Sequence, residues 1–432
     1  MMSNEVLNSF NRGGVMKVKR TEQIYIGENE TISKLCHISK NLYNQTNYVL
    51  KQQFIKKEKL SSYEDLVKLF QTPSENDEEN NYQKLPAQTA QWTIRKVREA
   101  WNSFFKAMKT WKKHPEEFKE MPKPPKYKNK NGEFILVFTN QQCKIENGLL
   151  KFPKMVGLEV ETRLDDVNLR EVRIIPRGVG YLIEIVYEKE IMDFAKDKLH
   201  RIMGIDIGVR NIVTIGDSIS REGIAVKGGV LKSINQYYNK ESARLKSISD
   251  RQNKDKRLTK RQKRLLMKRN RKIKDIMHKL SKAIVQYAKT RNIDTIVIGH
   301  NNGWKQSVNM GRINNQNFVE IPFSTLINQI KYKAEEAGIQ VIIQEEEYTS
   351  KCSFLDNESI EHHDEYMGKR IKRGIFRSKD GILMHADLNA VYNIIRKAFS
   401  EAFADGIEGI GLYPKSLSVS EFIGMITSKG GC

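Results

Sequence analysis

The first part of the chain carries apolar residues at the spacing of an α-helix. The capping signal Asn29-Glu30-Thr31 precedes a run of such residues, and the segment before it alternates as a strand does. The longest periodic segment has an aromatic stripe, which suits a helical core better than base stacking. The pattern predicts one strand and three helices, at residues 15–26, 32–49, 61–70 and 87–111.

A period of two replaces this helical pattern beyond residues 112–130, a basic segment rich in Pro, Lys and Gly. Short alternating stretches separated by turns follow between residues 134 and 187. They predict a small β-barrel. The strand at residues 15–26 is expected to join that barrel, so the helical segment between them is predicted to be an insertion.

Helices and strands are mixed from residue 201 to residue 403. An antiparallel hairpin, residues 201–216, comes first, and strand–helix–strand units follow it. Roughly half of residues 251–274 are Lys or Arg, and so dense a run of one sign favours phosphate contacts over a merely solvated face. This order is the layout of an RNase H-like sheet, with strands at 294–298 and 339–343 and helices at 231–247, 322–338 and 388–403.

Two aspartates stand where such a sheet brings carboxylates together. Asp206 ends the first strand of the hairpin amid hydrophobic residues, where an unpaired carboxylate is costly, and Asp387 opens the last helix. Carboxylates are the hard ligands that Mg²⁺ prefers, and two such ions roughly 3.5–4 Å apart serve phosphodiester hydrolysis. We therefore expect a two-metal Mg²⁺ site, although Asp387 alone also suits a simple helix N-cap.

Composition adds a polyanionic partner to this picture. The chain has 432 residues, enough for two or three domains, and a net charge of +22. No apolar run reaches the roughly 18 residues that a membrane span needs, and the start of the chain lacks the apolar core of a signal peptide. The four cysteines form no CxxC pair, so we expect reduced thiols, no zinc site and a cytoplasmic protein without membrane contact.

Several ordered stretches then indicate a family. They read GIDIGVRN, IVIGHNNGWKQ, YTSKCSFLD, YMGKRIKRGIF and HADLNAVYNI, with FTNQQCKI and VRIIPRGVGYLIEIVYEKEI ahead of them. Together they resemble the transposon-encoded TnpB (OrfB) proteins, RNA-guided nucleases with a RuvC-like domain that are related to the miniature type V CRISPR effectors. The resemblance is close from about residue 125 to residue 397 and weak in the helical segment.

The resemblance implies a multidomain α+β fold with an RNase H-like (RuvC) α/β nuclease domain, a small β-barrel wedge domain and an inserted helical recognition module. The expected parts are residues 1–26 as a leader and the first barrel strand, 27–119 as the recognition module, 120–198 as the wedge barrel, 199–347 as the RuvC-like domain with basic helices at 231–290, 348–384 as a target-nucleic-acid-binding insert without zinc, 385–403 as the final RuvC-like helix, and 404–432 as a flexible tail.

Two departures from the family pattern concern the site. Most members end the strand at residues 296–298 in Glu, whereas Gly299-His300 stands here. Most also carry a four-Cys zinc module after the YTS motif, of which only Cys352 remains, so that segment must fold around its own apolar residues. The neighbouring strand ends in three glutamates, and the chain resembles a branch in which the active-site Glu has moved to the position of Glu346. The alternative is a merely solvated acidic strand end.

By this resemblance the protein is an RNA-guided, Mg²⁺-dependent DNA endonuclease of a transposable element, with Asp206, Glu346 and Asp387 as catalytic metal ligands. Its partners would be a guide RNA and target double-stranded DNA with a short flanking motif, met at the prokaryotic nucleoid. The alternatives are a nuclease-inactive RNA-guided DNA-binding repressor, a CRISPR-linked type V effector and, more weakly, a DDE-type transposase.

Basic side chains and one aromatic side chain are expected to contact nucleic acid. Most lie in the basic helical segment or near the YMGKRIKRG motif, and a packing role suits the tryptophan equally well. The predicted contacts are Lys256, Arg257, Lys260, Arg261, Arg264, Lys268, Arg269, Trp304, Lys305, Lys369, Arg370 and Arg373.

Overall fold

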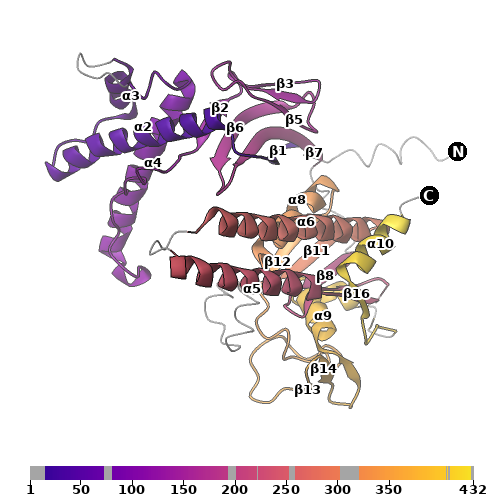
Figure 1. The fold of residues 1–432 in the computed structure, drawn as a ribbon. Helices are drawn as coiled ribbons and strands as arrows, with labels where there is room; N and C mark the ends of the chain where they lie inside the picture. Colours follow the sequence, from indigo (N-terminus) through magenta and orange to yellow (C-terminus); the bar gives the residue numbers. More distant parts are fainter. Residues whose placement is uncertain are drawn as a thin grey trace. The chain divides into compact units, whose positions relative to one another are not determined.

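The computed structural model describes residues 15–72, 80–192, 201–220, 222–252, 258–301, 321–404, 406 and 409–429. The chain divides into two units, one of residues 17–190 and one of residues 1–16 with 191–432. Figure 1 shows the elements of both. The expected leader before residue 15 lies outside the described residues, as do Lys256, Arg257, Trp304 and Lys305.

The unit of residues 17–190 begins with a strand and then becomes helical. Strand β1 (Val15–Ile26) is followed by three helices, as the periodicity predicts. Asn29 caps the first of them, because its side chain accepts a hydrogen bond from the N–H of Ile32 at 3.0 Å. The helical elements are α2 (Glu30–Ile55), α3 (Tyr63–Gln71), α4 (Ala87–Lys113) and the short 3₁₀-helix η1 (Pro115–Glu117).

The strands of this unit form two separate open sheets. One has the order β1-β7-β6-β2, and the other joins β3, β4 and β5. The strand near residue 20 therefore does join the later strands, but the expected closed barrel is not found among the described strands. Among the described strands, β3, β4 and β5 pair only with one another, so the ring of strands does not close. The bounds are β2 (Leu136–Thr139), β3 (Lys144–Glu146), β4 (Leu149–Lys151), β5 (Glu159–Glu161), β6 (Asn168–Pro176) and β7 (Tyr181–Met192).

The basic segment of residues 112–130 is tied down rather than a free linker. Asn44 of α2 donates to the carbonyl of Lys128 at 3.0 Å and accepts from its N–H at 2.8 Å. One turn further along α2, Asn47 donates to the carbonyl of Pro125 at 3.1 Å. These side chains satisfy backbone groups that lie outside any sheet or helix, so the segment has a defined path along α2.

The second unit is built on a six-stranded sheet with the order β12-β11-β8-β9-β10-β16. The hairpin of β8 and β9 and the next strand, β10, pair antiparallel, whereas β11, β12 and β16 join as parallel neighbours. The bounds are β8 (Ile202–Asp206), β9 (Asn211–Asp217), β10 (Gly223–Lys227), β11 (Thr295–Gly299), β12 (Gln340–Gln344) and β16 (Lys415–Ser418).

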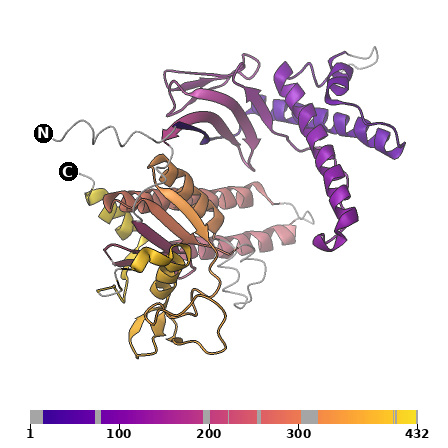
Figure 2. The same ribbon diagram turned by 180° about the vertical axis from the view of Figure 1, so that it is seen from behind.

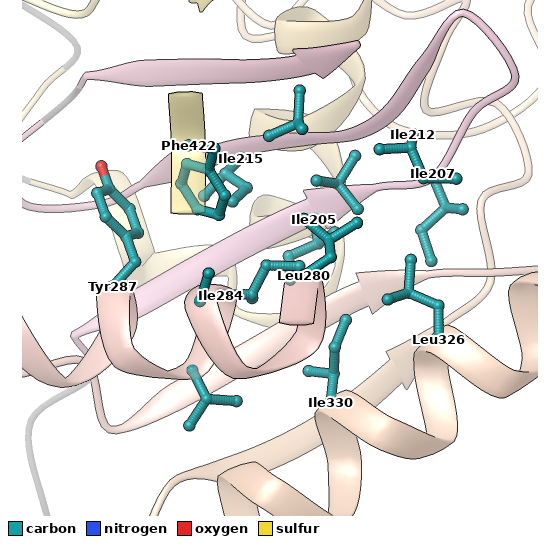
Figure 3. Close-up of a cluster of buried hydrophobic side chains, with 14 of the residues drawn as sticks. Ile205, Ile207, Ile212, Ile215, Leu280, Ile284, Tyr287, Leu326, Ile330 and Phe422 are labelled. Atoms are coloured by element: carbon teal, nitrogen blue, oxygen red, sulfur yellow. The ribbon is translucent and has the colours of Figure 1, made fainter. Parts of the chain in front are cut away.

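Helices cover both faces of this sheet. Side chains of β8 and β9, among them Ile205 and Ile215, meet Leu280 and Ile284 of α6 in a buried cluster (Figure 3). Helix α9 covers the other face (Figures 1 and 2), and it approaches so closely that a Cβ on Gly204 would lie 2.7 Å from a side chain of the helix. The helices are α5 (Gly229–Gln252), α6 (Lys260–Thr290), α8 (Phe323–Glu336), α9 (Ala386–Ala398) and η2 (Ser400–Phe403).

The predicted insert, residues 348–384, carries a small sheet and packs on α9. Its strands β13 (Lys369–Lys372) and β14 (Ile375–Arg377) pair antiparallel with each other, and β15 (Leu383–His385) adds to β14. Phe354 and Phe376 are buried in the same cluster as α9, so the insert folds around apolar residues as expected. The side chain of Asn389 on α9 also accepts from the N–H of Phe354 at 2.9 Å.

The expectation of a flexible tail at residues 404–432 is wrong for residues 415–429. Strand β16 pairs in parallel with β10, and helix α10 (Val419–Lys429) follows it directly. The Gly-rich composition suggested mobility, but Leu417, Val419 and Phe422 are buried in the main core. Burying these apolar side chains offsets the entropy lost on ordering the segment.

None of the helices described here has the length and apolar character that a membrane crossing requires.

We expect Phe422→Ala to lower the free energy of unfolding by about 3–5 kcal/mol, because it leaves a cavity where a fully buried ring now packs near Tyr287. Denaturant unfolding followed by circular dichroism measures this. Tyr413→Ala is the matched control, since that ring is 55% exposed, and it should change stability by less than about 0.5 kcal/mol. If Phe422→Ala lowers the free energy of unfolding no more than Tyr413→Ala does, α10 does not contribute to the core.

Candidate active site

The ends of three strands meet at one edge of the six-stranded sheet. Asp206 is the last residue of β8 and Gly299 is the last residue of β11. Because Ile298 pairs with Ile205, the next residue of each strand lies beside the other. On the far side of β11, Gly299 pairs with Gln344, the last residue of β12. Side chains that follow these ends therefore converge, as parallel strands require.

The carboxyl group of Asp206 is held in a desolvated and negatively charged place. Burial raises its pKa well above the ordinary value, and the charges of Glu346 and then Asp387 raise it further. The guanidinium of Arg370 acts in the opposite direction. The structure thus brings together the three carboxylates that the sequence selected, closely enough for their charges to interact.

Gly299 and Glu346 fit each other in space. A Cβ placed on Gly299 would lie 2.5 Å from Oε1 of Glu346 and 2.5 Å from the side chain of Ile394 on α9. Real Cβ atoms do not approach other atoms so closely, so no larger residue fits at position 299 unless its neighbours move. The carboxylate of Glu346 therefore occupies the space into which a side chain at the end of β11 would point.

Backbone contacts hold Glu346 in this position. Its N–H donates to the side chain of Asn301 at 2.8 Å, and its carbonyl accepts from the N–H and hydroxyl of Thr349. The carboxyl atom Oε1 is buried and has no hydrogen-bond partner among the described residues. Burial raises the pKa of Glu346 to about 7. A buried carboxylate oxygen without a donor is a costly arrangement that a cation or a proton would relieve.

Asp387 lies in the first turn of α9 and has partners on both oxygens. The side chain of His385 caps the helix by accepting from the N–H of Asp387 at 3.3 Å. Asn211 at the start of β9 donates to Oδ2 at 3.0 Å, and Arg370 of β13 lies 3.4 Å from Oδ1. The carboxylate is thus not the N-cap that the simpler interpretation of the sequence offered.

The donor set fits a hard divalent cation in its chemistry, because three carboxylates approach one another and one of their oxygens has no partner. Across the described part of the chain, however, no three His, Cys, Asp or Glu side chains are grouped closely enough to hold a metal ion as they stand. The oxygens of Asp387 are in contact with Asn211 and Arg370.

Arg370 is positioned by a buried carboxylate within the insert. Glu358 is 3% exposed, and its two oxygens accept from the N–H groups of Ser353 at 2.6 Å and Met367 at 2.8 Å. It therefore joins two chain segments just ahead of β13. Gly368 follows directly and leaves no room for a Cβ beside the ring of Phe376. Together these contacts fix the start of the strand that brings Arg370 to Asp387.

The expected nucleic-acid contacts fall into two groups. Arg269 donates to the side chain of Asn235 on α5 at 2.9 Å, so it helps to join the two long helices. Arg370 is paired with Asp387, as described above. The remaining described members are exposed and able to meet phosphate: Lys260, Arg261, Arg264, Lys268, Lys369 and Arg373.

Sequence reasoning missed the part played by Asn211. It closes the GIDIGVRN motif, and its position at the start of β9 brings its amide to Asp387 across 176 residues of chain. The sequence did show an amide side chain at the turn of a hairpin that carries a carboxylate, which could have marked Asn211 as a site residue. It could not show that Asn211 contacts Asp387, because a contact between distant residues leaves no local pattern.

Solved structures give weak likenesses. A mini-RNA-guided endonuclease, CRISPR-Cas phi3, is 12% identical with a TM-score of 0.42, covering 91% of this chain and 94% of its own. A Cas12f1–sgRNA–target DNA complex is 15% identical with a TM-score of 0.35, covering 87% of this chain and 98% of its own.

Comparisons of the sequence are more informative. The family model OrfB_IS605, described as a probable transposase, matches residues 185–305, and that of the Cas12f1-like TNB domain matches residues 323–394. A curated relative, the TnpB-like protein ORF457 of Acidianus two-tailed virus, is 25% identical over 89% of both chains. These matches span the strand ends, the insert and α9, and they agree with one another: over these segments the chain is similar to TnpB (OrfB) proteins.

Proposed function

We propose that the protein is an RNA-guided DNA endonuclease of a transposable element, which hydrolyses a phosphodiester at a metal-dependent RuvC-like site. Asp206, Glu346 and Asp387 are its catalytic carboxylates. The observation that carries the proposal is the fit between Glu346 and Gly299, by which the carboxylate of one strand fills the space left at the end of the next. Similarity to TnpB proteins supports the same activity.

The order of the sheet supports an RNase H-like assignment. A hairpin and a third antiparallel strand are followed by two parallel strands on the side of β8, and α9 crosses behind them. We assign the three catalytic roles to Asp206 at the end of β8, to Glu346 just beyond the end of β12, and to Asp387 in the first turn of α9.

Each carboxylate has a distinct part in the proposed site. Asp206 and Glu346, which share a desolvated position, are the ligands with the least competition from hydrogen bonds. Asn211 orients Asp387, and Arg370 balances its charge until a cation binds. When bound, divalent cations supply an activated water and stabilise the leaving oxygen.

Nucleic acid would be recognised in two ways. Pairing between a guide RNA and one DNA strand reads the sequence, while the protein contacts backbone and a short flanking motif. The net charge of +22 and the exposed basic side chains of α6, such as Arg261, Arg264 and Lys268, suit such backbone contacts.

Asp206→Ala and Asp387→Ala should each reduce cleavage of matched DNA more than about 100-fold, because each removes a carboxylate from the site. Binding of the copurified RNA should stay unchanged. A plasmid-cleavage assay with Mg²⁺ and a filter-binding assay measure the two properties. Asp380→Ala, which alters an exposed carboxylate in the insert, is the control and should cut normally.

Full cleavage by either site variant would refute the assignment. If the unaltered protein binds its RNA and matched DNA but does not cut with Mg²⁺, the repressor alternative holds instead.

Glu346→Gln should stabilise the protein in EDTA at pH 8 but not at pH 4.5. Burial raises the pKa of Glu346 from 4.5 to about 7 in the folded protein, so the folded state loses stability as the pH rises between these values. Gln has no charge to bury, and the gain at pH 8 should be on the order of 2 kcal/mol. Thermal unfolding at both pH values measures it.

Mg²⁺ provides the second arm of this experiment. It should raise the melting temperature of the unaltered protein at pH 8 and raise that of Glu346→Gln much less. Glu345→Gln, the same change at an exposed neighbour, is the control and should behave as the unaltered protein does. If Mg²⁺ stabilises Glu346→Gln fully, Glu346 is not the relocated ligand.

A further inference from the structure

Three basic side chains from separate parts of the chain lie within electrostatic reach of one another, on segments hydrogen-bonded near the start of α9. Arg210 lies in the turn between β8 and β9, Lys232 in the first turn of α5, and Arg373 in the turn between β13 and β14. Among the described residues, none of the three forms an ion pair or a side-chain hydrogen bond.

Backbone hydrogen bonds bring the first two together. The N–H of Gly228 donates to the carbonyl of Arg210 at 2.8 Å, and a Cβ on Gly228 would lie 2.9 Å from the carbonyl oxygen of Val209. The carbonyl of Gly228 in turn accepts from the N–H of Lys232 at 3.3 Å. The hairpin turn therefore lies directly against the start of α5.

Contacts at the start of α9 bring in the third. The carbonyl of Gly374, the residue after Arg373, accepts from the N–H of Ala386 at 3.1 Å. Gly374 has a φ of +84°, a backbone conformation that suits only glycine well. Asn211, next to Arg210, donates to Asp387 at 3.0 Å. Both turns are thus held by hydrogen bonds to residues at the start of α9, one to Ala386 and one to Asp387.

This gathering of like charges is unfavourable by itself. Burial and the charges of Arg373 and Arg210 lower the pKa of Lys232, which places all three groups within electrostatic reach of one another. Among the described basic residues near Asp387, Arg370 has a carboxylate partner, which is Asp387 itself. An anion bound among the other three would relieve their repulsion.

We propose that Arg210, Lys232 and Arg373 form a binding site, the phosphate site, for one backbone phosphate of the DNA strand that enters the active site. The assignment rests on the proposed function for the role of this phosphate, which lies beside the bond to be cut and holds the strand in place. The binding itself depends only on the side chains. Arginine and lysine from three directions suit the tetrahedral oxygens of a phosphodiester.

Lysine footprinting on the full chain with its copurified RNA tests the phosphate site. Sulfo-NHS-acetate is applied in EDTA, so that no cutting occurs, with and without a single-stranded DNA of about 12 nucleotides, a length that covers a typical single-strand binding groove. We expect the DNA to slow acetylation of Lys232 at least threefold. Lys331, exposed on α8, is the internal control and should react at an unchanged rate.

Variants provide an independent readout. Arg210→Gln, Lys232→Gln and Arg373→Gln should each lower the slope of log Kd against log salt by about one, whereas Lys331→Gln should leave it unchanged. None of the three breaks an ion pair among the described residues, so melting temperatures should hold.

Equal acetylation of Lys232 with and without DNA would overturn the proposal, as would protection by RNA of the same sequence but not by DNA. Unchanged salt slopes in all three variants would also overturn it. These outcomes do not depend on cleavage. If DNA protects Lys232 and the variants alter the salt slopes in a protein that never cuts DNA, the phosphate site is supported and the nuclease assignment is refuted.

Discussion

The arrangement of the second unit depends on one constraint, the burial of Asp206 and Glu346 side by side at the end of the sheet. Two carboxylates in a desolvated place raise each other's cost of ionisation, and no hydrogen bond among the described residues reaches Oε1 of Glu346. The fold nevertheless enforces the arrangement through strand register and through the absence of a side chain at Gly299. Retaining so unfavourable a feature is typical of a site that works.

The surroundings of these carboxylates are built to compensate for their charge. Arg370 reaches Asp387 from a strand whose start is fixed by the buried carboxylate of Glu358. Residues on α9, notably Asn389 and Asn393, bond to backbone carbonyls near the start of the same insert. The insert thus packs on the helix that carries one of the carboxylates, and its basic strand lies at the site. Hydrogen-bonded polar groups and an apolar core together define its fold.

Local patterns predicted much of the fold correctly. The helices of residues 30–113, the β8–β9 hairpin and the strand β11 follow from periodicity, because each element buries one face or both, and the apolar run of β12 was also correctly predicted as a strand. The errors arose where pairing is non-local. The strands of residues 136–192 form two open sheets, and composition suggested mobility at the C-terminus although its apolar residues complete the main core. Neither outcome can be predicted from a short stretch of sequence.

For the candidate site, the sequence by itself selected Asp206 and Asp387, because an Asp at the end of an apolar strand and another at a helix start are local features. The resemblance to a family branch selected Glu346 from a run of three glutamates. The tertiary structure adds the physical reason, since the end of β12 places Glu346 against Gly299 and leaves Glu345 and Glu347 exposed. Only the tertiary structure decided the contacts of Asn211 and Arg370, whose partner lies far away in sequence. Side-chain chemistry is carried by single residues, whereas distance between residues is set by packing of the whole chain.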